Sequence, residues 1–527
     1  MSDRPVIFDL ARALREHAGC LLGVVPGVAL ATLDATMLDV PAADVIAALD
    51  SDRYRIHWIQ GSYLIGAASG MALTRFLSER FGLRLCYLWA AIVFTLAATA
   101  CGFVSEVIWM TPLRLLQGLG NGLLISSGMV LLWRELADRK ELAMAMYGMG
   151  LFLAAMSGAV LGGMLTSLYS WRLIFWIHLP LGVPIVALSW WLLKPDRPEE
   201  PRPGRFDWFG LALLIAWVLS LNVVLDMGQY WGWLNSPFFA PWFVALLFTF
   251  TAFVAWGIWG RQPLINMRPF AIRNYGLALA AKALFAVNLY VLLQLLSSYM
   301  INLRGYQWHQ AALVILPATV GMLLGIFGGM SIGVDANRKA RMASGLLVMS
   351  LCTWQLADID LYTSKYWTAA ILLAWSCGAG VVIGPALLTM FEGLKPEQTA
   401  QAAGVFNIMR SLPAFLVGAT LMTLLTQSSD EHFDYLRRSI QTNRPIVTQA
   451  LQNPAQHFVQ RGSPPRRSEK QAHTFLGQWV HANAKAYAFQ DVLLLLALAP
   501  ALAAILILFV RIQDQPGNGE PRAENGD

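Results

Sequence analysis

The chain has 527 residues, of which 57% are apolar and 13% are charged, and its formal net charge is +6. A soluble protein carries about 25% charged residues, so this chain has too few to cover a soluble surface, and it is too apolar to be disordered. The 38 basic and 32 acidic residues are nearly balanced, which argues against a nucleic-acid-binding stripe. The composition therefore indicates a polytopic membrane protein.

Continuous apolar runs predict membrane-spanning helices, each near the length of about 20 residues that crosses the hydrocarbon layer. Helices are expected because open strands leave unpaired backbone groups in lipid, and the runs lack the alternation of a β-barrel. We predict fourteen spans, at residues 18–40, 57–77, 85–104, 109–133, 143–168, 173–193, 208–227, 238–259, 275–303, 308–333, 342–359, 367–391, 402–427 and 487–511.

The basic residues predict the orientation of these spans. An even number of spans places both termini on one side of the membrane. If that side is the cytoplasm, the cytoplasmic segments, counted with Arg75 and Arg511 at the adjoining span ends, hold 22 Lys and Arg residues, and the short outer loops hold five. The positive-inside rule then places the terminal segments 1–17 and 512–527 in the cytoplasm.

Two segments between the spans differ in composition from the rest of the chain. The linker at 194–207 contains four prolines and indicates a boundary between two bundles. The loop at 428–486 is polar, with helix-like spacing at both ends. We interpret it as two outward helical extensions of the flanking spans, joined by a Pro- and Arg-rich tip that serves docking or gating. A mobile linker is the alternative.

Ionisable residues inside the spans are costly and are functional by default. Asp34 lies in the first span and Arg114 in the fourth. Burial favours the neutral form of a carboxylic acid and a nearby cation favours the charged form. The pair therefore predicts a site that exchanges a proton when its surroundings change, with a static ion pair as the alternative. Lys282 lies in the ninth span, where it faces a cavity or snorkels to the inner surface.

Small residues form faces on two spans, where helices can approach each other closely. They are Gly118 in the fourth span and Gly158, Gly162 and Gly163 in the fifth. The five cysteines lack the spacing of a zinc site, and the chain has neither a phosphate-binding loop nor a hydrolase elbow. We therefore expect no metal, no cofactor and no enzyme activity.

Five short segments together carry a resemblance to a known family. The first contains Leu33-Asp34-Ala-Thr36 and the second is Arg114-Leu-Leu-Gln117-Gly118. The segments span residues 33–40, 114–118, 171–180, 404–410 and 482–491. Their combined pattern resembles the 14-span drug:proton antiporter branch of the major facilitator superfamily.

The resemblance implies an all-α major facilitator fold. An N-terminal six-helix bundle (18–193) would be followed by the cytoplasmic linker (194–207) and two inserted helices (208–259). A cytoplasmic loop (260–274) would then lead to a C-terminal six-helix bundle (275–511). It implies export of amphipathic small molecules across the bacterial inner membrane, driven by the proton gradient through alternating access. The long outer loop implies a periplasmic adaptor and an outer-membrane channel as partners.

The resemblance also implies roles for single residues. Asp34 would carry the proton and Arg114 would tune it. The expected cavity and second-bundle groups are Tyr63, Gln117, Lys282, Asn407 and Arg410. The expected cytoplasmic gate consists of Glu79, Arg80, Gly82, Arg84 and Asp335. A dedicated exporter of one endogenous metabolite, such as a siderophore or lipid-like product, and a non-transporting scaffold or sensor are the alternatives.

Several positions depart from the family pattern. Arg75 stands where Gly is expected and Glu79 where Asp is expected. Ala159 replaces a proline of the antiporter motif, and His178 replaces an asparagine.

Overall fold

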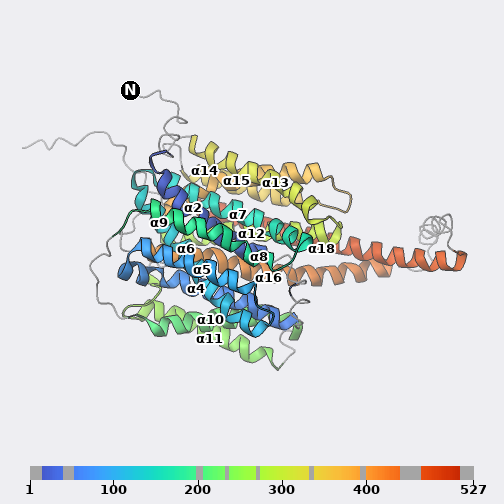
Figure 1. Ribbon diagram of the computed structural model, residues 1–527. Coiled ribbons are helices and arrows are strands. Elements are labelled where there is room, and N and C mark those ends of the chain that lie inside the picture. The colour runs from blue at the N-terminus through green and yellow to red at the C-terminus, as the bar shows by residue number, and fades with distance from the viewer. Residues whose placement is uncertain are drawn as a thin grey trace, which may run out of the picture.

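The computed structural model describes residues 15–38, 45, 53–196, 206–231, 237–268, 273–331, 338–391, 399–439 and 464–510. These residues form helices joined by short turns, and the helices run roughly parallel to one another (Figure 1). The first half of the chain contains α2 (Ala18–Met37), α4 (Arg53–Phe81), α5 (Leu83–Cys101), α6 (Val107–Glu135), η1 (Ala137–Arg139), α7 (Lys140–Leu168), α8 (Leu173–Trp176) and α9 (His178–Leu192).

The second half follows two intervening helices. These two are α10 (Trp208–Trp231) and α11 (Phe239–Trp259). The remaining elements are α12 (Arg273–Ser298), the π-helical turn η4 (Tyr299–Leu303), α13 (Trp308–Ser331), α14 (Arg338–Leu356), α15 (Lys365–Phe391), α16 (Thr399–Ser439) and α18 (Pro465–Phe509).

Each predicted span falls on a helix, which confirms the all-α membrane architecture. Eleven of the described helical segments are long and apolar enough to cross a membrane. The helices α4, α7 and α14 are outside that group, so the number fourteen stays a prediction. The sixth predicted span is interrupted at Ile177, between α8 and α9.

Glycines allow α4 and α6 to pack backbone against backbone. A Cβ atom at Gly66 would overlap the carbonyl oxygen of Leu115, and one at Gly118 would overlap that of Tyr63. Gly70 and Gly122 repeat this arrangement one turn further along the two helices. Only glycine fits at such crossings. The predicted packing role of Gly118 therefore agrees with its position.

The same arrangement recurs between α13 and α15 in the second half. A Cβ atom at Gly321 would overlap the carbonyl oxygen of Leu373, and one at Gly325 would overlap that of Cys377. This repetition supports two structurally related halves. The halves meet where α7 packs against α13 and α15, and where α16 packs against α4 and α6.

The helices α10 and α11 lie at one edge of the molecule (Figure 1). The helix α10 packs on α4, and α11 packs mainly on α10. Large apolar side chains of α11 such as Val244, Leu247 and Phe248 are exposed. An exposed apolar face of this size is expected where lipid covers it.

The helices α16 and α18 extend past the other helices at one end of the molecule (Figure 1). At a rise of about 1.5 Å per residue, their 41 and 45 residues reach lengths about twice the hydrocarbon thickness of about 30 Å. Asp491 of α18 accepts hydrogen bonds from Ser428 at 2.6 Å and His432 at 2.8 Å on α16. Both flanks of the loop at 428–486 are thus helical, up to Ser439 and from Pro465, while the tip of that loop, at 440–463, lies outside the described residues.

Candidate functional site

Asp34 lies in the last turn of α2 and points into the first half. Its side chain is 1% exposed. The surrounding side chains come from α4, α6, α8 and α9, so the carboxylate faces protein and not lipid. Lipid offers no hydrogen-bond partner, so a carboxylate there depends on such a protein environment.

Gln117 and Arg114 of α6 are the partners of this carboxylate. The Gln117 amide nitrogen donates a hydrogen bond of 2.7 Å to Asp34 Oδ1. Arg114 Nη1 donates to Gln117 Oε1 at 3.0 Å and lies 3.8 Å from Asp34 Oδ2. Gln117 therefore bridges the acid and the guanidinium and fixes their separation. The predicted Asp34–Arg114 pair is present, and both members belong to the same half.

Aromatic rings cover the other side of the guanidinium. The Arg114 guanidinium carbon lies 4.2 Å from the ring centre of Tyr63 on α4 and 5.8 Å from that of Phe175 on α8. A cation is attracted to an aromatic face, more strongly where water is absent. Tyr63 and Gln117, expected as cavity groups, are thus placed around the acid.

His178 is a member of this cluster that the sequence reasoning did not select. Its Nε2 atom lies 3.3 Å from Asp34 Oδ1, and its Nδ1 atom lies 3.2 Å from the carbonyl oxygen of Phe175. A carbonyl oxygen only accepts hydrogen bonds, so Nδ1 carries a ring proton. The Nε2 atom then lies beside a carboxyl oxygen of Asp34 and makes no hydrogen bond within the described part of the chain. The histidine in place of the family's asparagine was the sequence signal for this residue.

The Asp34 carboxyl is buried and lies among polar neighbours. Taking an unpaired charge out of water is costly, so a buried acid is either neutral or compensated. Asp34 has three polar neighbours, Arg114, Gln117 and His178. Any motion that alters one of these contacts changes how well the surroundings stabilise a charge on Asp34.

A cavity lies where α7 of the first half meets three helices of the second half. Each helix contributes residues at the spacing that brings side chains to one helix face. These residues are Gly148, Leu151 and Phe152 of α7; Leu279, Lys282, Phe285, Ala286, Leu289 and Tyr290 of α12; Ile383, Ala386 and Leu387 of α15; and Phe406, Met409 and Arg410 of α16.

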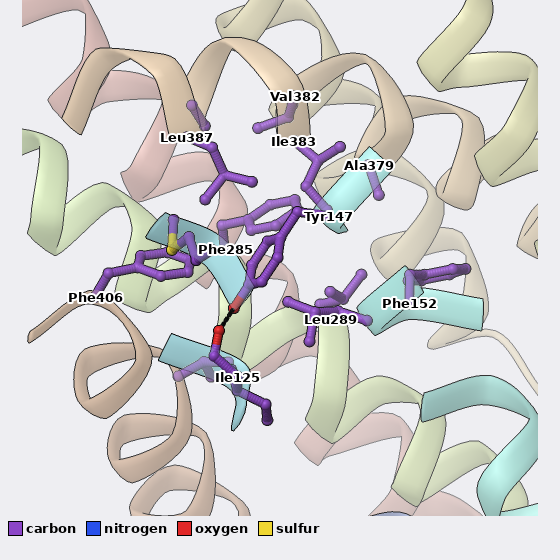
Figure 2. Packing of buried hydrophobic residues seen from close by; sticks show 14 of the residues in the cluster. Ile125, Tyr147, Phe152, Phe285, Leu289, Ala379, Val382, Ile383, Leu387 and Phe406 are labelled. Carbon is purple, nitrogen blue, oxygen red and sulfur yellow. Dashed lines mark hydrogen bonds between the residues drawn. The ribbon is translucent and has the colours of Figure 1, made fainter. Parts of the chain in front are cut away.

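Apolar side chains make up most of the cavity wall. Figure 2 shows Phe285, Ile383, Leu387 and Phe406 gathered around Tyr147 of α7. The Tyr147 hydroxyl donates toward the carbonyl oxygen of Ile125 at 3.3 Å and toward Asn407 Oδ1 at 3.1 Å. These bonds hold the ring beside the cavity.

The sequence-predicted cavity residues separate into two groups. Lys282 and Arg410 line the cavity. Lys282 is 7% exposed, so it does not snorkel to a membrane surface. Asn407 is not among the lining residues. It contacts the first half instead, since its amide nitrogen donates toward Ser126 of α6 at 3.4 Å.

The residues expected at the cytoplasmic gate lie where α4 ends and α5 begins. Glu79 pairs with Arg75 one turn earlier on α4, at 2.8 Å. Gly82 has a φ of 86°, a backbone conformation that favours glycine. Arg80 lies beside Phe81. Asp335, the gate residue expected in the second half, lies outside the described residues.

The segment after α9 ties this corner together. The Asp196 carboxylate accepts hydrogen bonds from the backbone N–H groups of Leu83 at 2.5 Å and Arg84 at 3.1 Å. A carboxylate at a helix N-terminus satisfies donors that the helix leaves free. The Arg84 side chain donates to the carbonyl oxygen of Trp190 at 2.5 Å. Asp196 is 112 residues from Arg84 along the chain, and no sequence signal indicated this contact.

A hydrogen bond of 2.9 Å joins Lys194 to Glu135 at the end of α6. This bond raises the pKa of Lys194 above its ordinary value, so the ammonium stays charged at neutral pH. The start of the linker thus contacts both α5 and α6.

The glycines of α7 bring that helix against the end of α2 that carries Asp34. A Cβ atom at Gly158 would overlap Thr36 Oγ1, and one at Gly162 would overlap the carbonyl oxygen of Met37. Gly163 is buried beside them. The helix α7 also packs against α13 and α15. It therefore connects the second half to the neighbourhood of Asp34.

Comparisons with known proteins agree with this architecture. The sequence model of the Major Facilitator Superfamily matches residues 24–418. The multidrug export protein EmrB of Escherichia coli strain K12 is 25% identical over 421 residues, covering 78% of this chain and 81% of that protein. Rv1250 of Mycobacterium tuberculosis, an uncharacterised transporter of the major facilitator type, is 28% identical over 434 residues, covering 79% of this chain and 73% of that protein.

Solved structures show the same fold. The proton:xylose symporter XylE superposes with a TM-score of 0.57 at 14% sequence identity, covering 94% of this chain and 95% of that one. The helical architecture, the two related halves and the family match lead to one conclusion: the chain is a multi-pass membrane protein that belongs to the major facilitator superfamily of transporters, with multidrug export proteins among its relatives.

Proposed function

We propose that this protein is a proton-coupled exporter of amphipathic small molecules, working by alternating access without a cofactor. The observation that carries the proposal is the buried Asp34 carboxyl with Arg114 at 3.8 Å and His178 at 3.3 Å. A buried acid between a cation and an imidazole has two protonation states that small rearrangements can exchange. The relative named as a multidrug export protein supports the substrate class.

The contacts of α7 supply a route for coupling. Rocking of the two halves would displace α7 at its contacts with α13 and α15. Gly158 and Gly162 would transmit that displacement to Thr36 and Met37, which follow Asp34 by two and three residues on α2. Because Asp34 and Arg114 lie in the same half, the coupling motion is a shift of α2 against α6. A separation of the two halves does not by itself move Asp34 away from Arg114.

We place the protein in the bacterial inner membrane with both termini in the cytoplasm. The distribution of Lys and Arg supports this orientation. In it, Gly82, Glu135 and Asp196 are at the cytoplasmic face, and the α16–α18 hairpin projects from the outer face. Exposed aromatic side chains on the hairpin, Tyr435, Phe475 and Trp479, suit a periplasmic adaptor, which would hand substrate to an outer-membrane channel.

Transport into proteoliposomes tests the proposal. The purified protein should accumulate a fluorescent amphiphile when a pH gradient is imposed. Asp34→Asn should abolish gradient-driven accumulation while exchange of internal for external substrate continues, because only the proton-carrying group is lost. Asp358→Asn, the same change at an exposed carboxyl after α14, is the control. Full gradient-driven transport by Asp34→Asn would remove Asp34 from the coupling role.

A further inference from the structure

The cavity between the halves has an unusual charge content. Its lining is aliphatic and aromatic except for Lys282, Arg410 and the hydroxyl of Tyr290. Neither an aspartate nor a glutamate is among the described residues that line it. The site therefore holds two basic side chains in apolar surroundings.

Lys282 has no polar partner among the described residues. Its side chain is 7% exposed, and its Nζ atom makes no hydrogen bond. The nearest compensating group is the ring of Phe406, whose centre lies 4.7 Å from Nζ. A cation–aromatic contact compensates only part of the cost of burying an ammonium group. An unpaired cation in such a place is expected where an anion binds.

Arg410 is compensated only slightly better. Its Nη1 donates a hydrogen bond of 2.5 Å to the Tyr290 hydroxyl, and its Nε has no partner. A guanidinium offers several donors in a fixed plane, and a carboxylate or sulfonate accepts two of them at once. Arg410 retains donors for such a group.

The two cations are directed into the same space by neighbouring helices. The helices α12 and α16 pack along each other, and Lys282 and Arg410 both line the cavity between them and α7. Phe152, Phe285 and Phe406 supply apolar wall around them. Two donors at one place and aromatic rings elsewhere match a molecule with one anionic head and an apolar body.

We propose that this cavity binds amphipathic organic anions, with the carboxylate or sulfonate held by Lys282 and Arg410. The inference rests on the proposed export function and narrows its substrate class. The anionic head supplies the counter-charge that the described protein residues do not, so binding replaces an uncompensated cation with an ion pair. A neutral molecule of the same shape gains only the apolar contacts, and a cation is repelled.

Two fluorescent probes with one skeleton test the proposal. 1-Anilinonaphthalene-8-sulfonate carries a sulfonate, and N-phenyl-1-naphthylamine lacks it. Saturable binding of each is measured on the full chain in lipid nanodiscs, with empty nanodiscs subtracted. The sulfonate should bind about tenfold or more tightly than the neutral probe, because hydrogen bonds to charged groups are stronger than neutral ones.

Variants assign this preference to the cations. Lys282→Met should remove the preference for the sulfonate probe by weakening the binding of that probe alone. Lys282→Arg should retain the preference. Lys470→Met, at an exposed lysine of α18, is the control. If Lys282→Met does not give a monodisperse protein, the ratio of the affinities for the sulfonate and the neutral probe is measured in Arg410→Gln. This variant should lower the ratio too. A ratio unchanged from the wild type in the folded variant, or equal binding of both probes by the wild type, overturns the proposal.

The outcome is separable from that of the transport experiment. Selective anion binding without transport driven by a pH gradient would sustain the anion site and reject proton coupling. Gradient-driven transport with equal binding of both probes would sustain the exporter and reject the anion site.

Discussion

The Asp34–Arg114 contact leads to a quantitative prediction about stability. Asp34→Asn keeps an oxygen that accepts from Gln117, and Arg114→Gln keeps a polar group beside it, but each removes one charge of the pair. Each single change leaves a buried charge with fewer partners, which typically costs about 3–5 kcal/mol. The double change leaves neither charge and should cost less than the two single changes added together.

The distance between the groups sets the size of this non-additivity. At 3.8 Å, two unit charges interact by about 4 kcal/mol at an effective dielectric constant of about 20. Gln117 and His178 remain as partners of the surviving group. We therefore expect a coupling energy of about 2–3 kcal/mol, near the upper end for residues in contact.

The assay is unfolding by sodium dodecyl sulfate, followed by the fluorescence of the 20 tryptophans, for the wild type, both single variants and the double variant. Asp358→Asn combined with Arg114→Gln is the control, because Asp358 lies after α14 in the other half. Additivity within about 0.5 kcal/mol for Asp34 and Arg114 would show that the charges do not stabilise each other and would refute the reasoning.

Three further predictions follow from the packing, the contact between Asp34 and His178, and the α16–α18 hairpin. Gly118→Ala should destabilise the protein by about 1–3 kcal/mol or more, because the added Cβ atom would overlap the backbone of α4. Gly328→Ala is the control and should not destabilise the protein, because nothing lies within 4 Å of its Cβ position. Equal effects of the two changes in the unfolding assay would contradict the packing. His178→Asn should remove one of two ionisations from the pH profile of substrate exchange, because Nε2 lies 3.3 Å from Asp34 Oδ1 and groups this close titrate together. An unchanged profile would show that they do not. The double variant Tyr435→Ala, Trp479→Ala should weaken pull-down of the adaptor but leave transport into proteoliposomes intact. Tyr362→Ala, at another exposed ring, is the control. Undiminished pull-down by the double variant would exclude these rings from docking.

The sequence singled out several residues that the structure places in close contact with one another or at helix crossings. Asp34 and Arg114 were identified because ionisable groups are rare within apolar runs, and they lie together in the structure. Gly118 was identified as a packing residue, and its Cβ position would overlap backbone of α4. Such features depend on residue type and on position within one helix, which sequence reports directly.

The grouping of residues into sites required the structure. Tyr63 and Gln117 were expected at the cavity and instead surround Asp34, while Asn407 joins α16 to α6 and α7. His178 joins the same acid from the start of α9. The rotation of each helix about its axis decides these contacts. Helices that are apolar all round carry little signal for that rotation.

The length of an apolar run and the cost of unpaired backbone in lipid determined the helices, the membrane location and the places where charge is exceptional. Those properties are local, so the sequence alone contains them. Only the tertiary structure decided that Lys282 and Arg410 face one cavity without a lining carboxylate among the described residues, and that Asp196 holds the start of α5. These contacts join segments far apart in the chain, and the backbone crossings at glycine, which set how closely helices approach, determine which segments meet.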